Sequence, residues 1–149
     1  MARVSCYHLA GLDMPAGWCD WIESGRRALL AGNPQQACDD FHQALNLGYA
    51  ELDAGPERLS EQSLLAVVTP LLNLVDAYLE AGRAEMALVK LSRCAELVAA
   101  HLLEASTPTQ RVNVSLARDL LLLEWPVLEQ RLCRMRPHFG SFFAAPVWH

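Results

Sequence analysis

The sequence predicts an all-α fold, and three observations support this prediction. Strong helix formers, namely Ala, Leu, Glu, Gln and Arg, dominate the periodic stretches. Apolar residues recur at steps of three, four and seven, which is the period of one helix face. No run alternates β-branched and polar residues in the way that a half-buried strand requires. With 149 residues, 52% hydrophobic and 19% charged, we expect one folded domain spanning 1–149.

The first expected element is a pair of antiparallel helices joined by a tight turn. One helix runs from about residue 15 or 16 to 31 and ends at Gly32. Pro34 suits the first turn of the next helix, with Asn33 as its N-cap. This second helix should stop near Gly48. The expected core positions are Trp18, Trp21, Ile22, Ala28 and Leu29 on the first helix, and Ala37, Phe41, Ala44, Leu45 and Leu47 on the second.

Residues 49–58 have little apolar periodicity and are expected to form a loop, or a frayed extension of the neighbouring helices. A long helical pattern then runs from about residue 56 or 57 to 81. Pro70 interrupts this pattern and leaves two alternatives. Either Pro70 kinks one helix, or Thr69 caps a new helix that begins at Pro70.

Two more helices are expected after Gly82. The first runs over 84–101 or 84–104 and the second over 108–136. The second should bend or split at Trp125-Pro126, because proline removes a helical hydrogen bond. The tail, 137–149, is rich in Phe, Gly and Pro and is expected to be irregular.

The two helix pairs repeat each other at an offset of 50 residues. Gly32 aligns with Gly82 at the turns. Small residues recur where helices must approach closely, and a large residue fills the space between them. A helical hairpin of this kind cannot bury its apolar face alone and needs a stacked neighbour. The matching packing positions are Ala37 with Ala87, Phe41 with Leu91, and Ala44 with Cys94.

At these positions the chain resembles the tetratricopeptide repeat family. The matching residues are Trp21, Gly25, Ala37, Phe41 and Ala44 in the first unit, and Leu71, Leu74, Tyr78, Ala87 and Leu91 in the second. Three positions depart from the pattern, namely Ser24, Ala28 and Val75. The family repeats every 34 residues, so the offset of 50 places about 16 extra residues in the interval 48–68.

The resemblance implies antiparallel helical hairpins stacked in a short right-handed array. Unit one would span about 18–48, followed by an insertion or extended helix over 49–68. Unit two would span about 68–104, and a long capping helix would follow over 108–136.

The resemblance also implies a function, that of a non-enzymatic scaffold, adaptor or regulatory subunit. Its partner would be another protein, bound as a peptide or helix on the inner face of the repeats. The residues that correspond to this inner face are Cys19, Ile22, Arg26 and Leu29 in unit one and Thr69, Leu72, Asp76 and Leu79 in unit two. The Lys and Asn with which some family members clamp a terminal carboxylate do not occur there. A chaperone for an exported protein is the alternative within this class.

The charge distribution makes nucleic acid a poor candidate partner. The net charge is −5, and Arg131, Arg134 and Arg136 form the only basic cluster. The most apolar window, 63–79, contains Pro70, Asn73 and Asp76, which favours a buried helix over a membrane span. The residues after Met1 lack the apolar core of a signal peptide. The five cysteines show no paired spacing, which is typical of a reduced, cytoplasmic protein.

No catalytic motif occurs in the sequence, so we expect neither an enzyme nor a cofactor. Cys38 and His42 are four residues apart and would share a helix face, but a zinc site usually needs three or four ligands. A metal- or redox-responsive sensor or enzyme that uses this pair is the third hypothesis. Asp39 and Asp40 are adjacent, point in different directions, and are read as favourable charges near a helix start.

The last helix and the tail provide a candidate surface for a homodimer. Leu120 to Leu123 place apolar side chains on most of the helix circumference. The tail adds more apolar side chains, namely Phe139, Phe142, Phe143, Val147 and Trp148. Two arrangements are open: the tail folds back on its own stack, or it inserts into a second copy or another partner.

Overall fold

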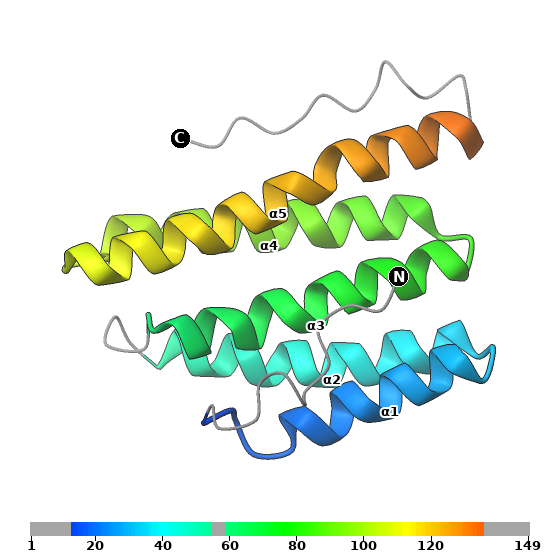
Figure 1. Cartoon of the computed structure of the whole chain (residues 1–149), viewed down its shortest axis with the longest axis horizontal. Coiled ribbons are helices and arrows are strands. Elements are labelled where there is room, and N and C mark those ends of the chain that lie inside the picture. The colour runs from blue at the N-terminus through cyan, green and yellow to red at the C-terminus, as the bar shows by residue number, and fades with distance from the viewer. Residues whose placement is uncertain (1–12, 55–58, 136–149) are drawn as a thin grey trace.

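The computed structural model describes residues 13–54 and 59–135. Within these ranges the chain forms five helices and no strands, so the all-α prediction is confirmed. The predicted tail, 137–149, lies outside the described residues, as do residue 136 and the segment 55–58. The helices are α1 (Trp18–Leu30), α2 (Pro34–Asp53), α3 (Glu61–Glu80), α4 (Ala84–Glu104) and α5 (Pro108–Met135) (Figure 1).

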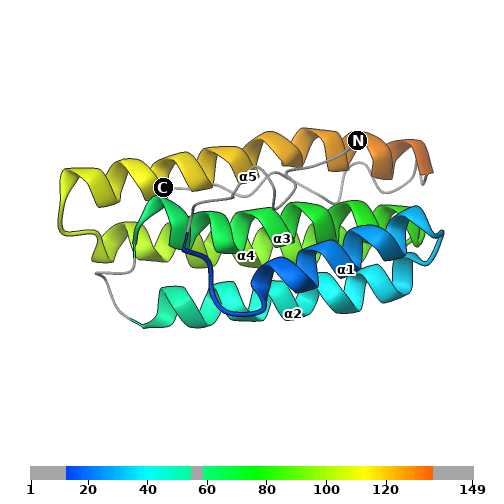
Figure 2. The ribbon, with the colours of Figure 1, turned by 60° about the horizontal axis from the view of Figure 1, so that its bottom comes forward.

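The five helices form two layers. Helices α1, α3 and α5 lie side by side in one layer, and α2 and α4 lie behind them in the other (Figures 1 and 2). Helix α3 occupies the middle, where it packs against α2, α4 and α5. Because α3 has neighbours on both sides, most of its residues are buried, including Val67, Leu71 and Leu74.

The turns at Gly32 and Gly82 have the same geometry. Both glycines adopt positive φ, at 76° and 72°, which is readily accessible only to glycine. Gly32 N donates to Leu29 O at 3.0 Å and Gly82 N donates to Leu79 O at 3.1 Å. The next amide donates five residues back at 2.8 Å in each turn, and this pattern closes a helix end. The two predicted turns are therefore confirmed. Their shared φ angles and hydrogen bonds also confirm that the two turns are equivalent.

The predicted start of α2 is confirmed, whereas its predicted end is wrong. Asn33 caps the helix, since its Oδ1 accepts from Gln36 N at 3.2 Å. The helix does not stop at Gly48 but continues to Asp53, where Leu52 is buried. A glycine near a helix end predicts termination, but here Gly48 lies in the helix because α3 packs directly on it.

Pro70 lies inside a single helix α3, which settles the two alternatives at Thr69-Pro70. The ring nitrogen of Pro70 cannot donate to the carbonyl four residues earlier, that of Ala66. The indole Nε1 of Trp18 donates to Ala66 O instead, at 2.9 Å. Trp18 of α1 therefore satisfies the acceptor that the proline leaves unpaired. Helix α5 is likewise continuous across Pro126, so it is not split there.

The core contains the predicted packing positions of both hairpins. Ala37, Phe41 and Ala44 are fully buried, as are their counterparts Ala87, Leu91 and Cys94. Trp21 departs from the prediction, because 39% of its surface is exposed. Among the described helices, α1 is the outermost of its layer, so none of them covers one of its sides (Figure 2).

Candidate functional site

The eight residues of the predicted inner face fall into two groups. Ile22 and Thr69 are buried, with 0% and 4% of their surface exposed, so neither offers surface to a partner. Both instead pack within the protein, because neighbouring helices cover their positions. The other six are half-buried, namely Cys19, Arg26, Leu29, Leu72, Asp76 and Leu79. The candidate partner surface is therefore limited to these six residues.

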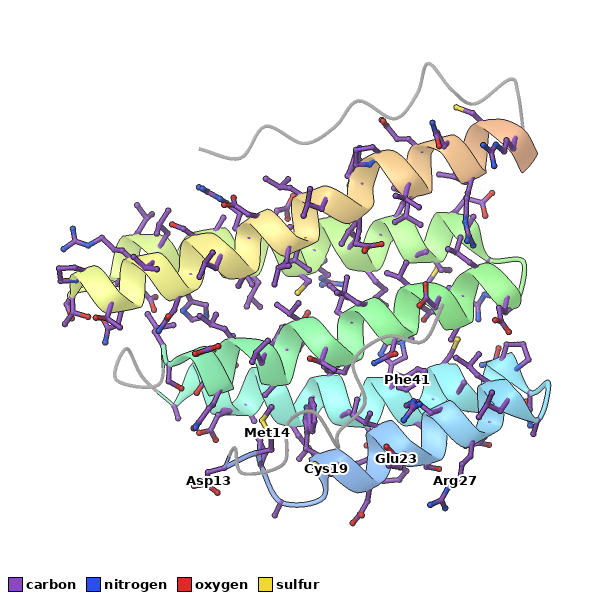
Figure 3. The ribbon with its side chains drawn as sticks, viewed as in Figure 1. Asp13, Met14, Cys19, Glu23, Arg27 and Phe41 are labelled. Carbon is purple, nitrogen blue, oxygen red and sulfur yellow. The ribbon has the colours of Figure 1, made fainter. Side chains whose placement is uncertain are left out.

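On α1, the candidate surface combines apolar and charged groups. Cys19 and Leu29 pack partly against the core. Arg26 Nη1 donates to Glu23 Oε1 at 3.2 Å, which forms an ion pair within the helix. Figure 3 shows Cys19 and Glu23 on successive turns of α1, with Arg27 pointing outward. A partner would therefore meet a mixed surface on this helix.

On α3, the three remaining candidates have a similar character. Leu72 and Leu79 are half-buried against the core, and Asp76 lies between them along the chain. At the offset of 50 residues, Asp76 corresponds to Arg26, so the two helices present opposite charges at equivalent positions. Such a surface suits a partner with apolar side chains and charges of both signs.

Phe41 occupies space that a side chain at Gly25 would need. A Cβ atom on Gly25 would lie 2.5–2.8 Å from three atoms of the Phe41 ring, which is too close for real contacts. The ring of Phe41 therefore lies directly against the backbone of α1 (Figure 3). This contact holds α1 against α2, so it is a packing feature rather than a surface for ligands.

The Cys38 and His42 pair, the candidate for metal or redox chemistry, has other partners. His42 Nε2 lies 2.8 Å from Tyr78 Oη, and the guanidinium of Arg83 lies 5.3 Å from the centre of the Tyr78 ring. Burial raises the pKa of the Cys38 thiol to about 11, so little reactive thiolate forms near neutral pH. Burial lowers the pKa of His42, helped by the nearby charge of Lys90. Among the described residues, no cluster of three or more His, Cys, Asp or Glu could hold a metal ion.

A buried polar group that sequence reasoning missed connects α1 and α2. Asp40 is buried, and its carboxylate accepts from Ser24 Oγ at 2.6 Å and from Gln36 Nε2 at 2.9 Å. Ser24 and Asp40 lie eight residues on either side of Gly32, so an antiparallel pairing about this turn would have brought them together. Ser24 occupies a position where the tetratricopeptide pattern has Leu. This polar residue at an apolar position was the signal in the sequence that could have indicated a buried polar contact.

Among the described helices, α3 is the one that is long and apolar enough to cross a membrane by length and composition. Its apolar window is 72% buried against the rest of the protein, as a core helix would be. The expectation that 63–79 forms a buried helix is consistent with this packing.

The fold and the candidate surface define a five-helix, two-layer protein in the described ranges, with repeated hairpin turns. No family model matches the chain, and searches of curated proteins and of solved structures also find no match.

Proposed function

We propose that this chain is a non-enzymatic protein-binding module, that is, a cytoplasmic scaffold, adaptor or regulatory subunit. Its helices would form a short tetratricopeptide-like stack, with α5 as the capping helix. The supporting observation is the repetition of one hairpin geometry, with equivalent glycine turns and equivalent buried positions 50 residues apart. Stacked hairpins of this kind present an extended face of adjacent helices to their partners.

The proposed partner site is the surface formed by the six half-buried residues of α1 and α3. Its leucines would contact apolar side chains of a peptide or helix, and Arg26 and Asp76 would match charges on it. Partner binding through mixed surfaces of this type depends on a few central side chains. Charge reversal at these two positions should therefore abolish most of the binding.

Affinity capture from an extract of the native cell, followed by mass spectrometry, tests this site. The test variant combines Arg26→Glu with Asp76→Arg, which keeps the net charge. The matched control combines Arg93→Glu with Glu96→Arg, two exposed residues of α4 in the other layer. Circular dichroism and the urea midpoint verify that each variant is folded.

The proposal expects proteins that the wild type and the α4 control capture and that the α1/α3 variant loses. The site is wrong if the α1/α3 variant retains every protein that the wild type captures. The function is wrong if the wild type captures nothing beyond the empty matrix. Ile22 is unsuitable for this test, because a charge at a fully buried position would unfold the helix pair.

The export-chaperone hypothesis and the metal or redox hypothesis can each be tested separately. A chaperone for an exported protein belongs to the same class, and a neighbouring gene for a secreted protein or its export apparatus would favour it. For the metal or redox hypothesis, the measurement is metal analysis of the purified protein with Cys38→Ala as control. The buried thiol of Cys38 and the contact between His42 and Tyr78 instead favour a structural role for this pair.

A further inference from the structure

Helix α5 carries two apolar stripes on opposite sides. One stripe is buried and packs on the other helices; it includes Val114, Ala117, Leu121, Leu128 and Leu132. The second, which we call the α5 stripe, is exposed. It consists of Val112, Leu116, Leu120, Leu123 and Val127, with exposed fractions between 43% and 70%.

The α5 stripe is continuous along the helix. Its residues follow each other at steps of four, four, three and four, so they stay on one face over about four turns. Contiguous exposed apolar surface of this kind marks an interaction site. Among the described helices, α5 is the outermost of its layer, so none of them covers this face (Figure 1).

The chain that follows α5 has the length needed to cover the stripe. Fourteen residues, 136–149, follow the last described residue. Extended, they reach about 46 Å. The stripe ends at Val112, which lies about 35 Å along the axis from the end of α5. The segment can therefore run back along the entire stripe.

The composition of this segment also matches the stripe. It contains Phe139, Phe142, Phe143, Val147 and Trp148, and no acidic residue. Asp119, which pairs with Arg118 at 3.4 Å, and Glu124 flank the stripe. The segment 136–149 brings Arg136 and no negative side chain toward these carboxylates. Its attachment to α5 also gives it a high effective concentration at the stripe.

We propose that residues 136–149 fold back along α5 and cover the α5 stripe. The segment then completes the end of the helical stack and keeps the stripe from associating with other molecules. This inference concerns a different face from the α1/α3 partner surface and stands independently of the proposed function.

Cross-linking within the full chain tests the proposal. The test variant carries Leu123→Cys on the stripe and Ala144→Cys in the segment, together with Cys133→Ser. The comparison variant keeps Leu123 and the native Cys133, which is exposed on α5 but off the stripe, and carries the same Ala144→Cys. Both variants also carry Cys6→Ser and Cys19→Ser. The buried Cys38 and Cys94 remain, since burial raises the pKa of each thiol and slows its reaction.

A short bismaleimide is added at micromolar protein, and peptide mass spectrometry identifies the links. Position 133 is closer to 144 in sequence, so an unattached segment should link to it at least as fast as to position 123. The proposal expects the reverse, with the link between 123 and 144 forming several-fold faster and within one chain. Adding Phe142→Ser and Phe143→Ser to the test variant should remove this advantage without changing the circular dichroism spectrum.

Three results would overturn the proposal. The first is a link to 133 that forms as fast as the link to 123. The second is cross-linking only between chains, which would assign the stripe to a second copy, as in the predicted homodimer. The third is no link to 123 in a variant whose spectrum shows intact helices.

Discussion

The hairpins α1–α2 and α3–α4 use the same turn and the same packing positions, but they fill the space between their helices differently. In the first hairpin Gly25 lies under the ring of Phe41. In the second, the residues 50 positions later are Val75 and Leu91, both buried. A small residue and a large one are thus replaced by two of intermediate size. The comparison indicates that packing constrains the combined volume of the two facing side chains, one on each helix of the hairpin. It does not constrain the identity of either residue.

The hairpins also differ in their buried polar groups. The first contains Ser24 and Asp40, joined by a hydrogen bond of 2.6 Å. The second has Leu74, which is buried, and Lys90, which is half-buried, at the equivalent positions. Helix α3 has neighbours on both sides and is more apolar throughout, whereas α1 is an end helix (Figure 2). Position in the stack therefore determines how polar each hairpin is.

The largest expected effect comes from breaking the volume match in the first hairpin. Gly25→Val should destabilise the protein by about 3 kcal/mol, because the new side chain collides with Phe41. Adding Phe41→Leu copies the second hairpin and should recover at least about 1 kcal/mol of this loss. Urea unfolding of the two single variants and the double variant measures the coupling. Purely additive effects would contradict the volume match.

The next effect concerns the hydrogen bond that Trp18 of α1 donates to the backbone of α3. Trp18→Phe keeps an aromatic ring but removes the donor to Ala66 O, and should cost about 2 kcal/mol because a buried carbonyl loses its partner. In a Pro70→Ala background, residue 70 supplies a helical N–H to that carbonyl. Trp18→Phe should then cost less than half as much, again by urea unfolding. Equal costs in the two backgrounds would show that Trp18 does not compensate for the proline.

A smaller effect separates the starts of α2 and α4. Asn33→Ala should destabilise the protein by about 1 kcal/mol, because Gln36 N loses its cap. Arg83 occupies the equivalent position before α4 and makes no side-chain cap there. Arg83→Ala therefore serves as the matched control for capping, although it also removes the contact with Tyr78. A thermal melt that shifts only for Arg83→Ala would contradict the assigned role of Asn33.

The smallest effect is a pH dependence that comes from His42, where the first hairpin meets Tyr78 of the second. Burial lowers the pKa of His42 in the folded state, so below the ordinary histidine pKa the unfolded chain binds more protons. Stability contributed by neutral His42 is therefore present above that pKa and is lost as the pH falls through it. Urea midpoints at pH 7.5 and 5.5 should differ more for the wild type than for His42→Gln. The same pH difference in both proteins would rule out His42 as its source.

Local chemistry explains which predictions succeeded. The turns at Gly32 and Gly82 depend on positive φ, and the start of α2 depends on the Asn33 cap and on Pro34; each is readable within a few residues. The core stripes followed from helical period alone, as with Phe41 and Leu91. Helix type and the starts and turns of the hairpins were therefore predictable from local sequence.

The end of α2 and the exposure of Trp21 were not predictable in this way. Gly48 reads locally as a helix stop, yet a Cβ there would collide with the backbone of Ala66 in α3. Its small size serves a close approach between two helices, which depends on where α3 packs. The extent of the candidate partner surface likewise depends on how the helices pack against each other. Helical period groups Ile22 with Arg26, but the packing of neighbouring helices buries the first and leaves the second half-buried.

The sequence by itself determined the helices, their turns and the offset of 50 residues between the two hairpins, since these depend on backbone preferences and apolar period. Only the tertiary structure decided that Pro70 lies in one continuous helix, that Asp40 is buried with Ser24, and that α5 keeps an exposed apolar stripe. Each of these outcomes depends on which helix supplies a donor, an acceptor or a covering surface across the core. Such pairings arise between residues far apart in the chain, and helical period does not encode them.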